Sequence, residues 1–489
     1  MPNVKVGSVI DIQFGYDHIP YTWDFQQEIP VVHSELVIEP GSYIMYHKNS
    51  YGSIPLTVNT GDRWVAENVP AFKTEPYISS PENYRSHFEF DIEFIIFQKY
   101  TQDYTTSWDA VREWLNKSFY FGVVLDNDGY LKSAAADIKA KCSSREEMLR
   151  MAYAFAKQVK WNHINSVDTD KTSLGSCLKE GKGNAAEVNL VLVQLLRRLG
   201  FDAAPVVMST RRHGRLSTLH SSINKLNYVI AAVISKDDTL LLDATETHCP
   251  YYLLPFRALN GQGQVMDKKS SGWINLQPSK KDKEMVIYTL AIDSLKMEGK
   301  LTYSRGDYAA LNFRNDYEEF NSDEAYLDHF KEGRQGLKII AHRIDNLDSL
   351  YEPVNEEFDV LINNASSNLN GELLVMPLLF DQEKENPFNT VERKYPVDFG
   401  YAWDRTIIAN YTIPQGYMVS NLPSNMAIKL HGNSASFVCL STVSGANITL
   451  KYKLNINKCV FEPAEYADLR EFFGKVVTKE AEPIVLKRN

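Results

Sequence analysis

The stretch SCLKEGKGNAAEVNLVLVQLLRRLGFDAAPVVMSTR, residues 176–211, constrains the fold more than any other part of the chain. Asn184 and Glu187 form an N-x-x-E capping pattern and Gly200 is a natural stop, so we expect a helix between these signals. Because this helix is apolar on nearly every side, it is predicted to be buried at the centre of a domain. The segment APVVMST that follows is expected to be a strand.

The segments around this helix predict a mixed fold. LNYVIAAVIS and TLLLDAT flank Asp237 and Asp238 and are expected to form a hairpin. Helices followed by antiparallel strands are typical of an α+β domain. On either side, alternating segments such as FEFDIEFIIF and NITLKYKLNI predict antiparallel β-sandwiches. The predicted fold class is therefore multidomain α+β.

Domain bounds follow from the same patterns. We expect an N-terminal β-sandwich over 1–104, an α+β core over 105–280 (the middle region), a C-terminal β-sandwich over 281–460, and a C-terminal helix and tail over 461–489. The segment NGQGQVMDKKSSGWINLQPSKKDKE, rich in Gly, Ser and Lys, is expected to hold the boundary after the middle region. A first strand is expected with Ile10, Ile12, Phe14 and Tyr16 on one face.

Composition and motifs exclude several classes of function. A net charge of −10 with no basic stripe argues against nucleic acid as a partner. No apolar run is long enough for a transmembrane segment, and no metal spacing or cofactor motif is present, so neither a metal nor a cofactor is predicted. The five cysteines are too scattered to define a disulfide framework. Cys439 and Cys459 are the one pair considered as a disulfide, and their state and the oligomeric state are left open.

The middle region has the layout of a cysteine acyl-transfer site. Such a site needs a thiol at a helix N-terminus, a histidine on a neighbouring strand and an aspartate on the next strand. The corresponding positions occur here in that order, at Ala185, Tyr228 and Asp243. A carboxylate that ends a strand also has a structural role open to it, because it accepts hydrogen bonds from the backbone or from Tyr228.

These segments, helix–turn–GKGN–helix followed by DAAPVVMSTR, LNYVIAAV and LLDAT, resemble the transglutaminase-like core of the papain-like cysteine enzyme superfamily. In particular, the chain resembles an uncharacterised three-part bacterial family with a β-sandwich on each side of that core. The flanking segments VKVGSVIDIQF, YPVDFGY, TIPQGYMVSNLP and YADLREFF carry the likeness outside the core. The likeness covers nearly the whole chain, but it does not include the front of the family's first domain. It implies that Met1 is an internal methionine of an exported precursor with a periplasmic or cell-envelope location, although this chain shows no signal peptide.

The resemblance also implies that the catalytic residues are lost. Active members carry cysteine at the position of Ala185 and histidine at that of Tyr228, and only Asp243 is retained. A methyl group cannot form a thioester, and a phenol with a pKa near ~10 is a poor base. Loss of the nucleophile from such a triad costs on the order of 10⁶ in turnover. The leading hypothesis is therefore a pseudoenzyme, an inactive protease- or transglutaminase-like module that binds a peptide, a glycopeptide or an envelope protein.

The alternative is an active cysteine protease or transglutaminase-type acyl transferase with a relocated nucleophile. Cys177 is the candidate thiol, while Cys249 beside His248 is disfavoured because neighbours in an extended chain point to opposite sides. His213 also lies in the loop before Tyr228. A third possibility is a purely structural spacer, favoured by a filled apolar cleft, whereas an open polar groove favours binding. The residues proposed to line a cleft are Asn184, His220, Asn227, Tyr251 and Tyr252.

Overall fold

The computed structural model describes residues 18–39, 41, 43–236, 238–268, 270–369 and 371–488. The first predicted strand, from Ile10 to Tyr16, lies outside the described residues. The chain is a mixed α+β protein with many antiparallel sheets, which confirms the expected fold class at that level. It divides into two compact units, one of residues 1–73, 81–115 and 217–226 and one of residues 74–80, 116–216 and 227–489. The domain bounds expected above stay a prediction.

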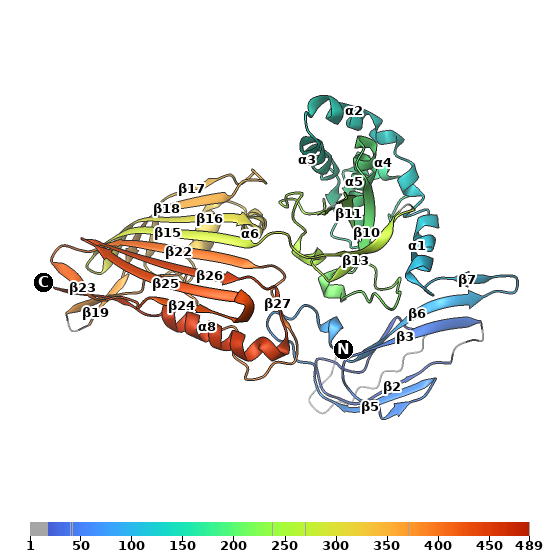
Figure 1. The fold of residues 1–489 in the computed structure, drawn as a ribbon, viewed down its shortest axis with the longest axis horizontal. Coiled ribbons are helices and arrows are strands. Elements are labelled where there is room, and N and C mark those ends of the chain that lie inside the picture. Colours follow the sequence, from blue (N-terminus) through green and yellow to red (C-terminus); the bar gives the residue numbers. More distant parts are fainter. Residues whose placement is uncertain are drawn as a thin grey trace, which may run out of the picture. The chain divides into compact units, whose positions relative to one another are not determined.

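The first unit is built from two small sheets (Figure 1). One has four strands, in which β6 pairs antiparallel with β1, β3 and β7, and the other has the order β2-β5-β4. Their bounds are β1 Thr22–Asp24, β2 Val31–Val37, β3 Ile44–Tyr51, β4 Val58–Asn59, β5 Arg63–Val69, β6 His87–Ile96 and β7 Thr101–Asp103. Helix α1, Trp108–Lys117, follows them.

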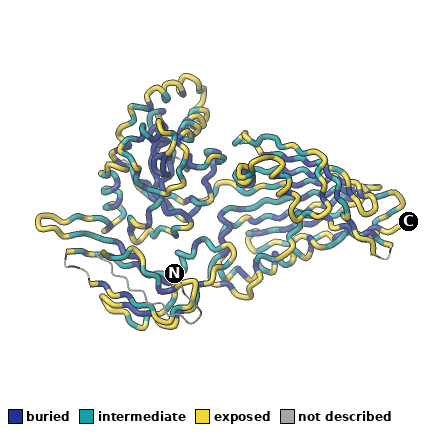
Figure 2. The backbone as a smooth tube through the Cα atoms, turned by 180° about the vertical axis from the view of Figure 1, so that it is seen from behind, coloured by how far each residue is buried: buried dark blue, intermediate teal, exposed yellow. Residues whose placement is uncertain are grey.

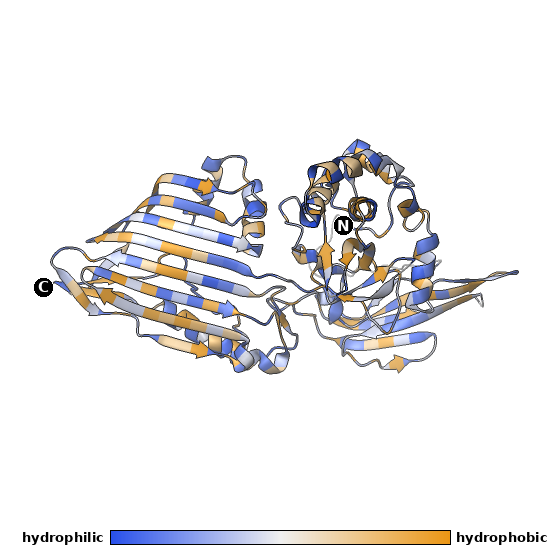
Figure 3. Cartoon of the chain, turned by 45° about the horizontal axis from the view of Figure 1, so that its top comes forward, coloured by the Kyte–Doolittle hydropathy of each residue, from blue (hydrophilic) through white to orange (hydrophobic). Residues whose placement is uncertain are grey.

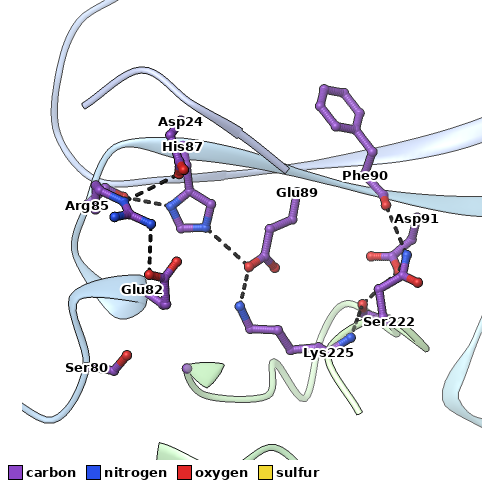
Figure 4. A network of polar contacts seen from close by, with 12 residues as sticks. Asp24, Ser80, Glu82, Arg85, His87, Glu89, Phe90, Asp91, Ser222 and Lys225 are labelled. Atoms are coloured by element: carbon purple, nitrogen blue, oxygen red, sulfur yellow. Dashed lines mark hydrogen bonds and ion pairs between the residues drawn. The ribbon is translucent and has the colours of Figure 1, made fainter. Parts of the chain in front are cut away.

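Strand β6 is buried on both faces over its first half. Phe88 and Phe90 pack against Trp64 of β5, with ring centroids 5.6 and 6.3 Å away, as the alternation predicts. The opposite face carries His87, Glu89 and Asp91, which are buried as well. The segment 217–226, far along the chain, lies against that polar face, and Figure 4 shows the resulting network.

In this polar network, the buried carboxylates of Glu89 and Asp91 bond to protein groups in place of water. The Lys225 ammonium donates to the Glu89 carboxylate, and His87 Nε2 lies 3.2 Å from the same group. Ser222 Oγ donates to Asp91 Oδ1 at 2.7 Å. Burial alone raises the pKa of Glu89, but the hydrogen bond from His87 and the charge of Lys225 outweigh burial and lower the pKa to about 2.

After α1, the described residues of the middle region form four further helices and a five-stranded antiparallel sheet in the order β12-β11-β10-β13-β14. The helices are α2 Lys132–Lys141, α3 Arg145–Ala156, α4 Leu174–Glu180 and α5 Ala185–Leu199. The strands are β10 Ala203–Met208, β11 Tyr228–Ile234, β12 Thr239–Leu242, β13 Gln262–Met266 and β14 Ser271–Asn275. The predicted hairpin is confirmed, because β11 pairs antiparallel with β12 from Ala231↔Leu242 to Ile234↔Thr239.

Helix α5 has the bounds and burial that its sequence predicts. Asn184 and Glu187 form a complete capping box, and Gly200 ends the helix with a φ of 93°. Nearly all its residues are buried, as the dark tube in Figure 2 shows. The Gly-, Ser- and Lys-rich segment that was expected to hold the boundary after the middle region contributes two strands to the sheet. It contains β13 and β14, because the apolar runs QVM and GWI continue the sheet beside β10.

The C-terminal part contains an eight-stranded sheet in the order β17-β18-β16-β15-β22-β26-β25-β24. Its neighbouring strands are antiparallel except for β15 and β22. Figure 3 shows hydrophobic and hydrophilic residues alternating along these strands, so that one face is apolar. The bounds are β15 Asp282–Asp293, β16 Lys296–Asp307, β17 Leu337–Asp345, β18 Val354–Asn363, β22 Trp403–Thr412, β24 Met426–Lys429, β25 Ala435–Ser444 and β26 Asn447–Ile456.

A second, four-stranded sheet has the order β19-β20-β28-β23 and shares one hydrophobic core with the first sheet and helix α8. The sequence predicts a tail after that helix, but β28 lies between two partner strands, because Ile484 and Leu486 are buried in this core. The bounds are β19 Ser366–Leu369, β20 Glu372–Val375, β23 Tyr417–Asn421, β28 Ile484–Arg488, α6 Tyr308–Glu318, α7 Asp323–Lys331 and α8 Tyr466–Glu480. Short paired segments complete the described strands: β8 Lys160–Trp161 with β9 Lys182–Gly183, and β21 Val397–Asp398 with β27 Val460–Phe461.

Two further expectations have an outcome in the structure. Within the described residues, no helix is both long and apolar enough to span a membrane. All five cysteines are free thiols, so Cys439 and Cys459 do not form a disulfide.

Replacing Lys225 by methionine tests the polar network on β6. The variant leaves the Glu89 carboxylate buried without its ammonium partner, and we expect the free energy of unfolding at pH 7 to fall by about 3–5 kcal/mol. Urea unfolding followed by tryptophan fluorescence measures this. The Glu89→Gln/Lys225→Met double variant, which removes the charge as well, is the control and is expected to recover most of the loss.

The same pair predicts an acid dependence of stability. Because folding lowers the pKa of Glu89 from 4.5 to about 2, its contribution is fully present above pH 4.5 and is lost as the pH falls towards 2. The control variant is expected to lose less stability in that interval than the unsubstituted chain. Equal pH dependence in the two proteins would contradict this account.

Candidate functional site

The loop before α5 depends on two glycines. Gly181 ends α4 with a φ of 67°, in the left-handed region that L side chains rarely adopt. At Gly183 a Cβ atom would lie 2.9 Å from the Glu187 side chain. Both glycines therefore serve the geometry of the capped helix start, and they do so whatever residue stands at position 185.

Ala185 is the first residue of α5 and has no exposed surface. Its backbone N–H donates to the carbonyl of Ile164 at 3.1 Å, and its methyl group belongs to a hydrophobic cluster that also contains Tyr228 and Cys249. The helix N-terminus is thus built and capped, but it presents a methyl group to a packed interior.

Tyr228 begins β11 and is also 0% exposed. Its hydroxyl donates to Asp243 Oδ2 at 3.0 Å and lies 2.8 Å from Thr245 Oγ1. Burial, followed by the charge of Asp243, raises the pKa of this phenol above its ordinary value. The structure therefore joins the last two positions of the predicted triad, with a phenol that holds its proton more tightly than usual.

Asp243 follows β12 and has no exposed surface. Its Oδ1 accepts hydrogen bonds from Asn189 Nδ2 at 3.0 Å and from the Thr245 N–H and Oγ1 at 3.1 and 2.7 Å. Asn189 also donates to the carbonyl of Val229 at 2.8 Å and accepts from the N–H of Ala244 at 2.9 Å. The carboxylate is thereby the point at which α5, β11 and the end of β12 are joined.

Arg257 completes this arrangement, and no sequence signal indicates it. Its Nε donates to the Tyr228 hydroxyl at 3.0 Å, its Nη2 to Thr245 Oγ1 at 2.5 Å and its Nη1 to Glu246 Oε2 at 2.6 Å. The guanidinium carbon lies 4.2 Å from the centroid of the Trp161 ring. The side chain of Arg257 thus lies against the phenol of Tyr228 and joins it to Thr245 and Glu246.

Cys177 lies in α4 and is 1% exposed. Burial, together with a hydrogen bond to Glu187, raises the pKa of its thiol to about 12. Among the described residues, no histidine makes a hydrogen bond with this thiol. The surroundings of Cys177 therefore lack what a cysteine nucleophile requires.

Cys249 is buried as well. Its thiol donates to the carbonyl of Leu253 at 3.3 Å, and burial raises its pKa. The neighbouring His248 instead pairs with Glu318 at 2.9 Å, so the two adjacent side chains do not form a catalytic pair.

The residues proposed to line a cleft are engaged elsewhere. Asn184 caps α5 and is fully buried, while Asn227 bonds to the backbone and hydroxyl of Thr210 at 2.9 and 3.0 Å. Tyr251 and Tyr252 are half-buried and pack on each other and on Tyr351.

The two histidines of the loop before Tyr228 are not part of this cluster of residues. His220 is exposed, belongs to the first unit and stacks on His47 with ring centroids 5.0 Å apart. His213 ends a short 3-10 helix, Arg211–His213, and is half-buried. Across the described ranges, no group of three or more His, Cys, Asp or Glu side chains is arranged to hold a metal ion.

Comparison with known proteins places this geometry in context. A family model described as a domain of unknown function with a solved structure (DUF3858) matches residues 371–486, which lie in the C-terminal part. The whole chain is similar in fold to a crystal structure from Parabacteroides distasonis titled "putative protease", with a TM-score of 0.57 and 13% identity. That similarity covers 96% of this chain and 75% of the other. No curated protein matches the sequence.

Removing the Tyr228 hydroxyl tests the role of this cluster. Tyr228→Phe leaves Asp243 Oδ2 and Arg257 Nε without a buried partner, and we expect a loss of about 1–3 kcal/mol in the free energy of unfolding, measured by urea denaturation. Tyr120→Phe, at a residue that is 47% exposed, is the matched control and is expected to change stability by less than about 0.5 kcal/mol. Equal stability of the two variants would show that the phenol is not integral to the fold.

Proposed function

We propose that this chain is a catalytically inactive protein with a transglutaminase- or protease-like core, which acts as a binding or assembly module. The observation that carries the proposal is the environment of Tyr228. By the family resemblance, this residue stands where active members have their histidine base, and here it is bonded to Asp243 and Arg257 with no exposed surface.

A nucleophile is missing at position 185, and a histidine base is missing at position 228. An acyl transfer needs a nucleophile in contact with the substrate carbonyl and a base within hydrogen-bond reach of that nucleophile. Ala185 offers no lone pair, and its position is closed by packing. Burial and the charge of Asp243 raise the pKa of the Tyr228 phenol, so the phenol stays protonated at neutral pH and is not available as a base.

The environment of Cys177 supports the same conclusion. With a thiol pKa of about 12, only about one molecule in 10⁵ carries the thiolate at pH 7. The thiolate is the reactive form of cysteine. An enzyme with Cys177 as its relocated nucleophile would have to open this site and add a base.

The packing around Ala185 and Tyr228 supports the role of a scaffold for the middle region. Asn184 and Asn227, which were expected to line a cleft, use their side-chain amides in internal hydrogen bonds. Few donors or acceptors therefore remain at these two residues for a bound peptide or glycopeptide. Recognition of a partner is therefore assigned to surfaces outside this core. The envelope location of the module is carried by the family resemblance alone.

An activity assay tests the proposal. Proteolysis of fluorescein-labelled casein and incorporation of dansylcadaverine into casein are both expected to proceed at the rate seen without the protein. An activity that is lost in Cys177→Ser or Cys249→Ser, but kept in Cys142→Ser, would overturn the proposal and identify the nucleophile.

A further inference from the structure

The strand β24 ends the eight-stranded sheet and leaves one edge unpaired by any described strand. It pairs with β25 from Met426↔Cys439 to Lys429↔Ser436, and Leu430 N donates to Ala435 O at 2.9 Å. Because an antiparallel strand directs alternate residues to opposite edges, Met426 and Ile428 bond towards β25. The N–H and C=O groups of Ala427 and Lys429 point to the outer edge.

A groove runs between this edge and helix α8, beside which β24 lies in Figure 1. Its larger part has a volume of about 930 Å³ and is lined by Met426 and Ile428 of the strand and by residues of α8 that include Arg470, Gly474 and Thr478. A second part of about 410 Å³ shares Ile428, Glu471 and Lys475 with the first and continues to His431. We call the two parts together the β24–α8 groove.

Gly474 keeps the floor of this groove open. A glycine inside a helix costs about 1 kcal/mol relative to alanine. A Cβ atom at Gly474 would meet only Asn386 Nδ2, at an ordinary contact distance of 3.6 Å, and the residue has no positive φ. Neither backbone conformation nor close packing therefore requires glycine here, so a methyl group fits at this position, whereas a long side chain would enter the groove.

The groove has a net excess of one positive charge, because its lining carries four cations (Lys429, Arg470, Lys475 and Lys479) and three carboxylates (Asp468, Glu471 and Glu482). Lys475 pairs with Glu471 and Lys479 with Glu482, each at 2.6 Å, so their charges are compensated internally. Arg470 makes no ion pair with any described residue. Lys429 at the outer edge likewise has no carboxylate partner within the described part of the chain. The groove is therefore complementary to a carboxylate placed near Arg470.

We propose that the β24–α8 groove binds an extended, acidic peptide segment of a partner protein as an added strand. The peptide backbone pairs with Ala427 and Lys429, and alternate side chains enter the groove. Apolar side chains pack on Met426 and Ile428, while an acidic side chain between them pairs with Arg470. The short edge and the charge of Lys429 disfavour pairing with a second copy of this chain.

This inference goes beyond the proposed function, because it lies on the C-terminal sheet and holds whether or not the middle region is catalytic. It also assigns a site within the segment that matches the domain of unknown function.

Calorimetric titration of the full chain with blocked heptapeptides tests the inference. The probe Ac-TVTETVT-NH2 places Val, Glu and Val on one face, and Ac-TVTKTVT-NH2 reverses the central charge. We expect the Glu peptide to bind at least about tenfold more tightly than the Lys peptide, and Arg470→Gln to abolish that difference. N-methylation of alternate edge-facing amides is expected to weaken binding by at least about tenfold, because it removes strand pairing.

Two variants at one position separate groove occupancy from folding. Gly474→Met fills the floor and is expected to weaken binding of the Glu peptide at least about tenfold, whereas Gly474→Ala keeps the groove open and is the folded control. The inference is overturned if neither peptide binds, if both bind equally, or if Gly474→Met binds as tightly as Gly474→Ala. None of these outcomes bears on catalysis, so failure here is distinguishable from failure of the proposed function.

Discussion

The buried carboxylate of Asp243 is the interaction on which the middle region depends. An isolated charge in a protein interior costs several kcal/mol, and here hydrogen bonds from Asn189, Thr245 and Tyr228 compensate it. The same bonds join α5 to β11 and to the chain after β12, and Arg257 extends them outwards through the Tyr228 hydroxyl. These hydrogen bonds hold the helix and the strands of the middle region together.

Local signals in the sequence predict part of this arrangement. The capping box at Asn184 and the helix end at Gly200 depend only on residues close together in the chain, so α5 could be predicted from the sequence. The β11–β12 hairpin could be predicted for the same reason. The bond between Tyr228 and Asp243 follows from two strands already predicted to pair.

Contacts between distant residues could not be predicted in this way. Arg257 reaches Tyr228 from a short 3-10 helix whose sequence has no catalytic signature. Glu89 and Lys225 lie on segments far apart in the chain, so a strand that reads as half-exposed is buried on both faces. His220 was expected in a cleft, yet the segment that carries it is bonded to β6 through Ser222 and Lys225. Strand β28 likewise depends on a core formed by residues more than a hundred positions earlier, such as Leu373.

Packing closes the surroundings of Ala185, and the reactivity of a thiol introduced at this position tests that closure most directly. The Ala185→Cys variant is labelled with iodoacetamide in the folded state, its thermal transition is compared with that of the unsubstituted chain, and each cysteine is followed by mass spectrometry. We predict that the introduced thiol reacts as slowly as Cys249, which is also 0% exposed, and at least about 100-fold more slowly than the half-exposed Cys142. Labelling in the folded protein at the rate of Cys142 or faster would contradict the account and show that the site is open.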